Sequence, residues 1–387
     1  MNVKQIYTLM NDVSNEILGK SDIIQEDLNG IIDFGTAIFN AGAVDNYVKS
    51  LVDHIGKVVF VNRPYAGNVP SVLMDSWEFG SVLEKVSAEL PDATENESWN
   101  LTNGQSYDPH IFYKPSINVK FFDNKITFEI PVSITEMQIK ESFSNAGQLN
   151  AFVSMIYDAV DKSMTVKVDG LIMRTINTMI AKTIATDFPT GEYGNNSTTR
   201  AVNLLKLYND KFEKTLTVEK AITDPDFVRF ASYEIGMYRD RMAKISTLFN
   251  IGGKPRFTPA DDLHVVMLSD FVNASNSYLQ SDTYHNEYTA LPNAETVPYW
   301  QSSGTGYDFG VISEINVKLD ESTTVEISGV IGVMFDKYAV AICNTDKRVT
   351  SQYNARAEFF SNWYKYDCHA IADTDENFVV FFIADAE

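Results

Sequence analysis

Cysteine, clustered histidine and long apolar runs are all scarce in this chain of 387 residues. The two cysteines, Cys343 and Cys368, cannot build a disulfide framework, and no C-x-x-C motif occurs. The five histidines are scattered along the sequence, which argues against a zinc site. No apolar run approaches the roughly 18 residues that a membrane helix needs. The N-terminus lacks the basic and then apolar layout of a signal peptide, so we expect a cytoplasmic chain with no membrane partner.

Positive charge is also in short supply. Lys and Arg number 31 against 52 Asp and Glu, which gives a formal net charge of −21. Such a surface repels phosphate and therefore disfavours tight electrostatic binding of nucleic acid. The hydrophobic fraction of 44% and the charged fraction of 21% are typical of a globular protein. The length allows one elaborate domain or two ordinary ones with a sizeable core.

Familiar catalytic and nucleotide-binding motifs are missing. The glycines of SGTGYDFG (residues 303–310) do not have the G-x-G-x-x-G spacing, and NIGGKPR (residues 250–256) departs from a P-loop at two required positions. Neither G-x-S-x-G nor H-E-x-x-H occurs. Cys368 and His369 are adjacent, but neighbours on a strand point to opposite faces. The segment DTDEN (residues 373–377) is predicted to be a solvated turn. We therefore predict no catalytic, cofactor-binding or metal-binding residue.

Helical periodicity is strongest after Leu149. Apolar residues recur with a 3.6-residue period up to Ile184, which predicts one long helix that ends before Asp187 and packs on a core. Shorter helices are predicted over residues 200–213 and from the Asp224-Pro225 cap through Leu248 to Gly252-Gly253. Residues 1–50 predict short amphipathic helices that are too small to bury a core of their own, and we expect them to lie as an arm on another surface.

Strand patterns occupy the remaining parts of the chain. Residues 117–130 alternate apolar and polar around Asp123-Asn124, which predicts an extended hairpin with one apolar face. A two-stranded ribbon is only marginally stable alone, so it needs a partner surface. The polar segment 76–116 is predicted to be an irregular loop that serves function or contacts another chain. The other expected strands are residues 57–61, residues 263–268, two segments around Asp336-Lys337 and residues 378–384, with a loop-like region over 280–310.

The stretch SQYNARAEFFSNWYKYDCHA (residues 351–370) concentrates aromatic residues near the C-terminus. Its composition is compatible with a ligand platform, a catalytic pocket around Cys368 and His369, or a structural belt. The order of elements around it resembles that of the major capsid proteins of tailed bacteriophages, those of short-tailed phages in particular. Residues 50–61 resemble the start of the peripheral domain in that family, residues 145–187 its spine helix, and residues 263–340 its axial domain.

The most specific part of this resemblance is the aromatic stretch itself. Family members often carry Asn-Pro-Arg-Gly, then aromatic residues, then a final strand. Here the matching residues are Asn354, Ala355, Arg356 and Ala357, followed by Phe359, Phe360, Trp363 and Tyr364 and then by FVVFFIA. Alanine replaces both the proline and the glycine of the pattern.

The resemblance implies an α+β fold of the HK-ninety-seven-like capsid type. It divides the chain into an N-terminal arm (1–50), the start of the peripheral domain (51–75), an extended loop (76–137), the peripheral domain with its spine helix (138–259), an axial domain (260–345) and a return to the peripheral domain (346–387). Because the chain starts at a methionine without a long leading segment, we expect no fused scaffolding domain.

The function implied by the resemblance is that of a major capsid protein. Such a chain self-assembles through hexamers and pentamers into an icosahedral or prolate phage head around double-stranded DNA, assembled in the host bacterial cytoplasm. Expected partners are other copies of the chain, a separate scaffolding protein and a portal protein, with packaged DNA bound only weakly and non-specifically. No cofactor and no enzymatic activity are expected.

Six residues are candidates for contacts between subunits. They are Arg356, Trp363, Tyr364, Trp99, Phe121 and Phe128, and an arginine at position 356 suits an ion pair between subunits. Two alternatives stay open at this point. An encapsulin-type nanocompartment shell shares the same fold but packages cargo enzymes. An acidic cytoplasmic hydrolase is the alternative from a different functional class, and no hydrolase motif in the sequence supports it.

Overall fold

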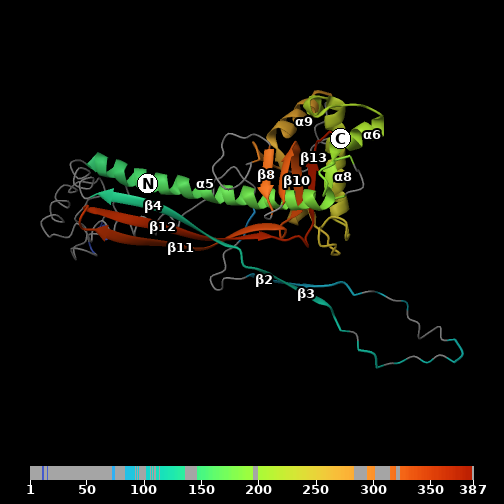
Figure 1. Ribbon diagram of the computed structural model, residues 1–387, viewed down its shortest axis with the longest axis horizontal. Coiled ribbons are helices and arrows are strands. Elements are labelled where there is room, and N and C mark those ends of the chain that lie inside the picture. The colour runs from blue at the N-terminus through green and yellow to red at the C-terminus, as the bar shows by residue number, and fades with distance from the viewer. Residues whose placement is uncertain are drawn as a thin grey trace. The chain divides into compact units, whose positions relative to one another are not determined.

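The computed structural model describes two compact units, drawn in Figure 1. The described residues are 72–74, 83–91, 114–135, 146–194, 199–282, 294–300, 314–319 and 323–385, with isolated positions within 11–15 and 93–112. Unit 1 comprises Met1–Glu78, Lys125–Arg174 and Ile342–His369, and unit 2 comprises Phe79–Asn124, Thr175–Ala341 and Ala370–Glu387. The expected limits of the peripheral and axial domains differ from this division and stay a prediction.

Unit 1 is built on a four-stranded sheet. Its strand order is β1 (Leu73–Met74), β11 (Val340–Asn354), β12 (Phe359–Ala372) and β4 (Lys125–Thr135). Strands β12 and β4 pair antiparallel in an unbroken register from Phe359 opposite Thr135 to His369 opposite Lys125. Burial alternates along the first half of β12, so that Phe360, Tyr364 and Tyr366 share the buried face. The predicted aromatic stretch is therefore the hairpin of β11 and β12.

The long helix predicted after Leu149 is confirmed as α5 (Ala146–Asp187), a single helix of 42 residues. At about 1.5 Å per residue it is about 63 Å long. It continues through Gly170 without a break, and Figure 1 shows it running along the strands of unit 1. Its buried stripe includes Val160, Met164, Val168 and Ile172, which are four residues apart, and from Leu171 to Ile184 most positions are buried.

Unit 2 contains a five-stranded sheet with helices packed against it. The strand order is β5 (Ala201–Asn203), β13 (Phe378–Phe382), β10 (Val330–Asp336), β6 (Leu263–Leu268) and β7 (Glu295–Val297). The helices are α6 (Leu204–Phe212), α7 (Val218–Ala221), α8 (Pro225–Met242) and α9 (Ser269–Asp282). A short 3-10 helix, η2 (Ala260–Asp262), lies between α8 and β6. Helix α6 packs against β13 and α9 against β6, and α8 contacts both helices. All five residues of β13 are buried, as the continuous apolar run predicts.

Two smaller antiparallel pairs complete unit 2. Strand β8 (Glu314–Lys318) pairs with β9 (Thr324–Ser328), and β2 (Leu83–Ala88) pairs with β3 (Ile117–Phe122). The predicted hairpin of residues 117–130 is wrong, because β3 pairs with β2 and β4 pairs with β12. A tight hairpin at Asp123-Asn124 would need positive φ, and among the described non-glycine residues only Glu213 and Glu358 have it. Segment 76–116 is likewise not wholly irregular, since it contains β2.

The helices predicted in unit 2 need smaller corrections. Residues 201–203 form β5 and not helix, so α6 begins at Leu204, with Asn203 as its N-cap. Helix α8 begins at the predicted Asp224-Pro225 cap, whose carboxylate accepts from the backbone N–H groups of two following residues. It ends at Met242 and not near Gly252, because the N–H of Thr258 bonds to the Met242 carbonyl and the chain folds back. The predicted strand at residues 57–61, nearly all of the N-terminal arm and most of 280–310 lie outside the described residues.

Candidate functional site: the ribbon of β2 and β3

The ribbon of β2 and β3 has two chemically different faces. In its register Lys85 lies opposite Lys120, and Val86 lies opposite Val119. Side chains alternate along each strand, so the lysines occupy one face and the valines the other. Like charges directly opposite each other destabilise a ribbon. The lysine face is therefore favourable only if acidic groups cover it.

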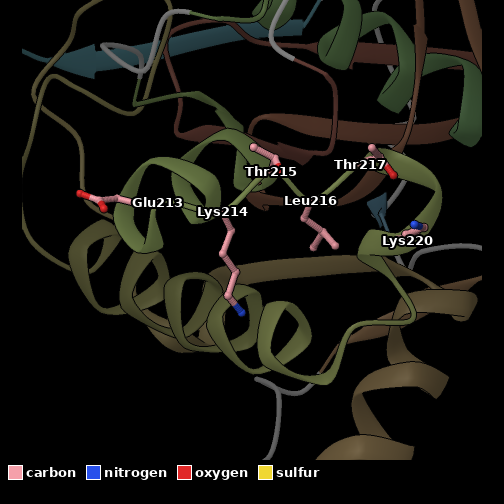
Figure 2. A pocket seen from close by; sticks show the side chains of 6 residues that line it. All are labelled: Glu213, Lys214, Thr215, Leu216, Thr217 and Lys220. Carbon is pink, nitrogen blue, oxygen red and sulfur yellow. The ribbon is translucent and has the colours of Figure 1, made fainter.

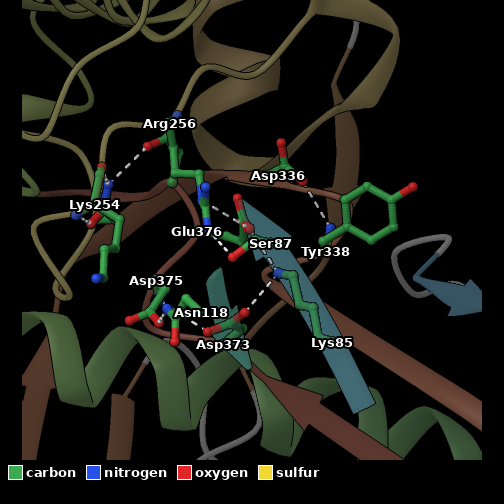
Figure 3. Close-up of polar contacts among 12 residues, drawn as sticks. Lys85, Ser87, Asn118, Lys254, Arg256, Asp336, Tyr338, Asp373, Asp375 and Glu376 are labelled. Carbon is green, nitrogen blue, oxygen red and sulfur yellow. Dashed lines mark hydrogen bonds and ion pairs between the residues drawn. The ribbon is translucent and has the colours of Figure 1, made fainter. Parts of the chain in front are cut away.

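An acidic turn, residues 373–377, covers the lysine face (Figure 3). The Lys85 ammonium lies 2.6 Å from Asp373 and 2.7 Å from Glu376. The Lys120 ammonium lies 2.7 Å from Asp373 and 3.2 Å from Asp375. The Asp373 side chain is 1% exposed and receives both lysines, so it is the centre of this ion-pair cluster. Its neutralising partners make burial of the carboxylate tolerable.

A second set of contacts extends the attachment toward the distal end of the ribbon. The Arg256 guanidinium lies 3.2 Å from Glu376 and donates to Ser87 at 2.9 Å. Lys254 pairs with Glu89 at 2.6 Å, just after β2. Figure 3 shows Arg256, Ser87 and Glu376 converging from separate segments. Contacts therefore fix β2 from Lys85 to Glu89 and β3 at Lys120, which sets the direction of the ribbon relative to the rest of unit 2.

The ionisation of the cluster follows from its partners. Burial opposes ionisation of Asp373, but the hydrogen bonds from Lys120 and Lys85 outweigh it and lower the pKa of that carboxyl. Burial also acts against Lys120, yet its contacts with Asp373 and Asp375 raise the pKa of the ammonium. Lys182 on α5 has its pKa lowered by burial and by the charge of Lys120. Asp373 and Lys120 are thus both charged at neutral pH.

The opposite face of the ribbon is mostly apolar and open to solvent, with the exposed Glu84 opposite Phe121 near one end. The exposed fractions are 60% for Val86, 60% for Ile117, 41% for Val119 and 62% for Phe121. Four large apolar side chains on one short ribbon form a contiguous patch of the kind that marks a protein–protein contact. The face is held in place by the ion-pair cluster behind it, and it has the chemistry of a docking surface.

The candidate contact residues fall into different environments. Phe121 lies on the exposed apolar face of the ribbon. Phe128 is half-buried on β4 opposite Tyr366, and Trp363 is half-buried on β12 opposite Pro131. Trp99 lies outside the described residues.

Arg356 and Tyr364 differ sharply from each other. Arg356 is exposed in the turn between β11 and β12, where the backbone N–H groups of Arg356 and Ala357 donate to the Asn354 side chain at 3.2 and 3.3 Å. The Asn354 side chain thus forms the turn that proline and glycine would favour. Tyr364 has no exposed surface, which places its ring in the core of unit 1 and not on a contact surface.

Cys368 and His369 do not form a catalytic pair. Both are buried on β12 and point to opposite sides of the strand. Burial, with a contribution from Asp367, raises the pKa of the Cys368 thiol to about 12, so the thiolate is absent at neutral pH. Burial also lowers the pKa of His369. Nowhere in the described part of the chain do His, Cys, Asp and Glu side chains gather as a metal site would require.

Among the described residues, the hollows around α6 and α8 are open to solvent and carry no recognisable catalytic chemistry. One of about 410 Å³ follows α6 and is lined by Glu213, Lys214, Leu216 and the residues around them (Figure 2). Lys214 there hydrogen-bonds the Tyr208 hydroxyl at 2.7 Å, and Glu213 has a φ of 52° at the C-cap of α6. These are structural roles. Of the helices that the structure describes, none has the length and apolar character to cross a membrane.

The sequence patterns did not predict the ion-pair cluster. The segment of residues 373–377 reads as a solvated turn, but Asp373 and Glu376 are buried. Lys85 and Lys120 lie about 250 to 290 residues away in the chain, and no local pattern connects them to the turn. The signal that could have found the cluster is the lysine in the middle of each alternating strand.

Comparison with known proteins agrees with this architecture. A family model described as "Phi29-like phage major capsid protein" matches residues 7–382. A chain from the structure of head fiber and inner core protein gp22 of native bacteriophage P68 has a TM-score of 0.50 and 10% identity, covering 84% of this chain and 88% of that one. A chain from the capsid of Staphylococcus phage Andhra has a TM-score of 0.47 and 9% identity over 84% and 88%. No curated protein matches.

The family match covers nearly the whole chain, and the mixed helix-and-strand fold with its long α5 is the HK-ninety-seven-like capsid fold. The family match does not favour the encapsulin alternative. The chain belongs to the Phi29-like phage major capsid protein family.

Proposed function

We propose that this chain forms the shell of a phage head through hexamers and pentamers, with double-stranded DNA enclosed. The observation that carries the proposal is the ribbon of β2 and β3, which turns four exposed apolar side chains away from the unit that anchors it. A monomer gains nothing from such a face, whereas a neighbouring copy can bury it. Repetition of one modest contact around closed symmetry gives a stable shell.

Assembly of a uniform shell requires more than one kind of chain in this proposal. A separate scaffolding protein directs curvature, a portal protein occupies one vertex, and the head is built in the bacterial cytoplasm. The net charge of −21 supports only weak, non-specific contact with packaged DNA. Arg356, exposed at the tip of the β11–β12 hairpin, is proposed to pair with an acidic group on another subunit.

Electron microscopy of the expressed protein tests the proposal. The chain co-expressed with the products of its neighbouring genes is expected to give closed particles, while the chain alone gives capsomers or irregular assemblies. A small soluble oligomer under every condition would contradict the shell function. Uniform shells of native size from the chain alone would contradict the need for a scaffolding protein, and particles filled with cargo enzyme would indicate a nanocompartment.

A further inference from the structure

A groove lies between α6 and α8, two helices of unit 2 that contact each other (Figure 1). It consists of two hollows of about 520 and 360 Å³, which meet at Lys211 and Phe230. We call the larger one, which reaches Asp226 at the start of α8, the aromatic hollow. The smaller one reaches Arg241 near the end of α8. The groove thus follows α8 for about 22 Å, at 1.5 Å per residue.

Aromatic rings form the floor of the aromatic hollow. Tyr208 and Phe230 are buried, and their ring centroids lie 5.5 Å apart. The Phe212 ring packs on both, at 5.1 and 5.8 Å, yet Phe212 is 50% exposed. Tyr233, which also lines the hollow, is 59% exposed. Because the rings of the floor are packed against one another, they form a surface that loses little entropy when a partner covers it.

The Lys211 ammonium lies among three of these rings. It is 4.9 Å from the ring centroid of Phe230, 5.8 Å from that of Phe212 and 5.9 Å from that of Tyr233. The attraction of a cation to aromatic rings holds the ammonium over the hollow. Lys211 is also in the last turn of α6, where a cation interacts favourably with the helix dipole. The dipole accounts for the lysine, but it does not account for the exposed rings around it.

Positive charge exceeds negative charge around the aromatic hollow. Lys211, Lys214 and Arg229 line it with a single carboxylate, that of Asp226. Lys214 and Arg229 lie 3.5 and 3.8 Å from Asp226, and Lys211 lies 3.7 Å from Glu234. A charge-assisted hydrogen bond is shorter, about 2.7–2.9 Å, so these cations can bind further carboxylates at closer range. Three cations against one carboxylate is the reverse of the balance in the whole chain, whose net charge is −21.

We infer that the groove between α6 and α8 binds an acidic amphipathic helix of the separate scaffolding protein. The inference deepens the proposed function, on which it rests, because it names where that partner docks and by what chemistry. A large apolar side chain of the partner covers Phe212 and Tyr233, and its carboxylates pair with Lys211 and Arg229. The groove accommodates about four turns of helix, and an apolar helix face laid into a groove is a recurrent mode of peptide recognition.

Charge complementarity also confines the partner to this groove. The acidic surface of the rest of the chain repels an acidic helix, whereas the aromatic hollow attracts it. Exposed aromatic residues next to an arginine are also the composition of the residues that contribute most to protein–protein binding. The groove therefore supplies both affinity and position.

Single-stranded nucleic acid is the competing occupant, because it also binds to aromatic rings and cations. The carboxylates along the groove argue against it. Asp210, Asp226 and Glu234 line the two hollows, and the Asp226 side chain is 63% exposed. A nucleic acid brings a phosphate with every nucleotide past these carboxylates, whereas a peptide carries its carboxylates only at particular positions. The observations therefore favour a protein helix.

A designed peptide tests the chemistry of the groove. The probe is a fluorescently labelled amphipathic helix of about 15 residues, with leucine and one tryptophan on one face and glutamate on the other. A second probe has lysine in place of glutamate. Fluorescence anisotropy with the full, unassembled chain is expected to show that the acidic probe binds at least about tenfold more tightly than the lysine probe. Equal binding of the two probes, or no binding of the acidic probe, would overturn the inference.

Two groove variants separate the contributions of charge and of the exposed ring. Lys211→Glu with Arg229→Glu reverses the charge, and Tyr233→Ser removes an exposed aromatic side chain. Each is expected to weaken binding of the acidic probe by about tenfold.

Matched controls make the same kinds of change at exposed residues outside the groove. They are Arg239→Glu with Lys244→Glu, and Phe257→Ser. Both are expected to bind the acidic probe as the wild type does, and circular dichroism melts confirm that all variants fold. If the groove variants bind the probe like these controls, the inference is overturned. A labelled oligothymidylate is expected to bind the wild type and the groove variants equally weakly. Its loss in the groove variants with unchanged peptide binding would assign the groove to nucleic acid.

Assembly connects the groove to the scaffolding protein. Without a partner, the groove variants are expected to form capsomers at the same concentration as the wild type. When the products of the neighbouring genes are co-expressed, the wild type and the controls are expected to give closed particles, and the groove variants only the irregular assemblies of the chain alone. Closed particles from the groove variants, or loss of their capsomers without a partner, would overturn the inference although the shell function stands. A wild type that assembles under no condition would refute the shell function, and the peptide measurement does not depend on that result.

Discussion

Replacing Asp373 by asparagine should release the ribbon of β2 and β3 without unfolding unit 2. Asparagine keeps the side-chain oxygen that accepts from the Asp375 N–H at 3.0 Å, so the turn is preserved. It removes the charge that holds Lys85 at 2.6 Å and Lys120 at 2.7 Å. The two opposed lysines then repel each other with less compensation.

The size of the effect follows from the partial exposure of the lysines. Loss of one partner from a fully buried ion pair costs about 3–5 kcal/mol. Here the lysine side chains are 22% and 33% exposed, and each keeps a second acidic partner, Glu376 or Asp375. The expected cost is therefore about 2 kcal/mol, the contribution of a hydrogen bond to a charged group. This corresponds to about a 30-fold shift toward the released ribbon.

Hydrogen exchange of the unassembled chain measures this shift. A released two-stranded ribbon is marginal, so the paired amides of β2 and β3 should exchange about 30-fold faster in Asp373→Asn while β10 and β13 are unchanged. Asp346→Asn is the control, because Asp346 is 58% exposed and pairs with Arg348 at the surface. A change in the ribbon of less than about threefold, the range of ordinary surface substitutions, would refute the reasoning.

The same cluster predicts a pH dependence of definite sign. Asp373 has its pKa lowered from the ordinary value of 3.8, since the lysines stabilise the ionised carboxylate more than burial disfavours it. A carboxyl with a lowered pKa contributes stability that is complete above 3.8 and is lost as the pH falls through the folded-state value. Protection of the ribbon amides should therefore hold above pH 3.8 and decline as the pH falls below it, and Asp373→Asn should weaken that decline.

Three further experiments test other parts of the structure. Gly329→Ala should destabilise the chain by several kcal/mol, because φ is +75° and a Cβ would lie 2.4 Å from the Ile383 carbonyl oxygen. Gly236→Ala, on α8 with open space around the Cβ position, should stabilise the chain by up to about 1 kcal/mol. Thermal melts of the two variants and the wild type measure both changes. Cys368 should resist iodoacetamide until the chain is denatured, as mass spectrometry of labelled peptides can show, and rapid native labelling would contradict its burial. Arg356→Ala should impair shell assembly with an unchanged melting temperature, and normal particles in electron micrographs would count against an ion pair between subunits.

Local sequence patterns were sufficient to predict the elements that have one dominant periodicity. The apolar stripe of α5 and the continuous apolar run of β13 each specify type and burial within a few residues. The cap of α8 is equally local, because Asp224 and Pro225 act on the first turn alone. The resemblance of residues 354–364 to the capsid family likewise depends on a short ordered motif.

Strand pairing and helix ends could not be predicted from local sequence patterns. Alternation in residues 117–122 defines a strand and its two faces, but it does not say that the partner is β2, which precedes residues 89–116 in the chain. The end of α8 at Met242 depends on a hydrogen bond from Thr258, which follows it by 16 residues. The burial of Asp373 depends on lysines that are distant in the sequence. Each of these features is decided by tertiary contacts that outweigh local propensity.

The two faces of the ribbon together explain how an exposed apolar surface can be specific. An apolar face alone would bind many surfaces, and on a mobile ribbon it would lose much of its binding free energy to ordering. The ion-pair cluster removes that cost before any neighbour arrives, because Lys85 and Lys120 are satisfied together only where Asp373, Asp375 and Glu376 converge. Polar contacts within the chain thus set the direction in which Val86, Val119 and Phe121 are presented. Contacts within each copy thus set the direction of the ribbon, and contacts between copies supply the binding affinity. A shell of identical subunits requires both.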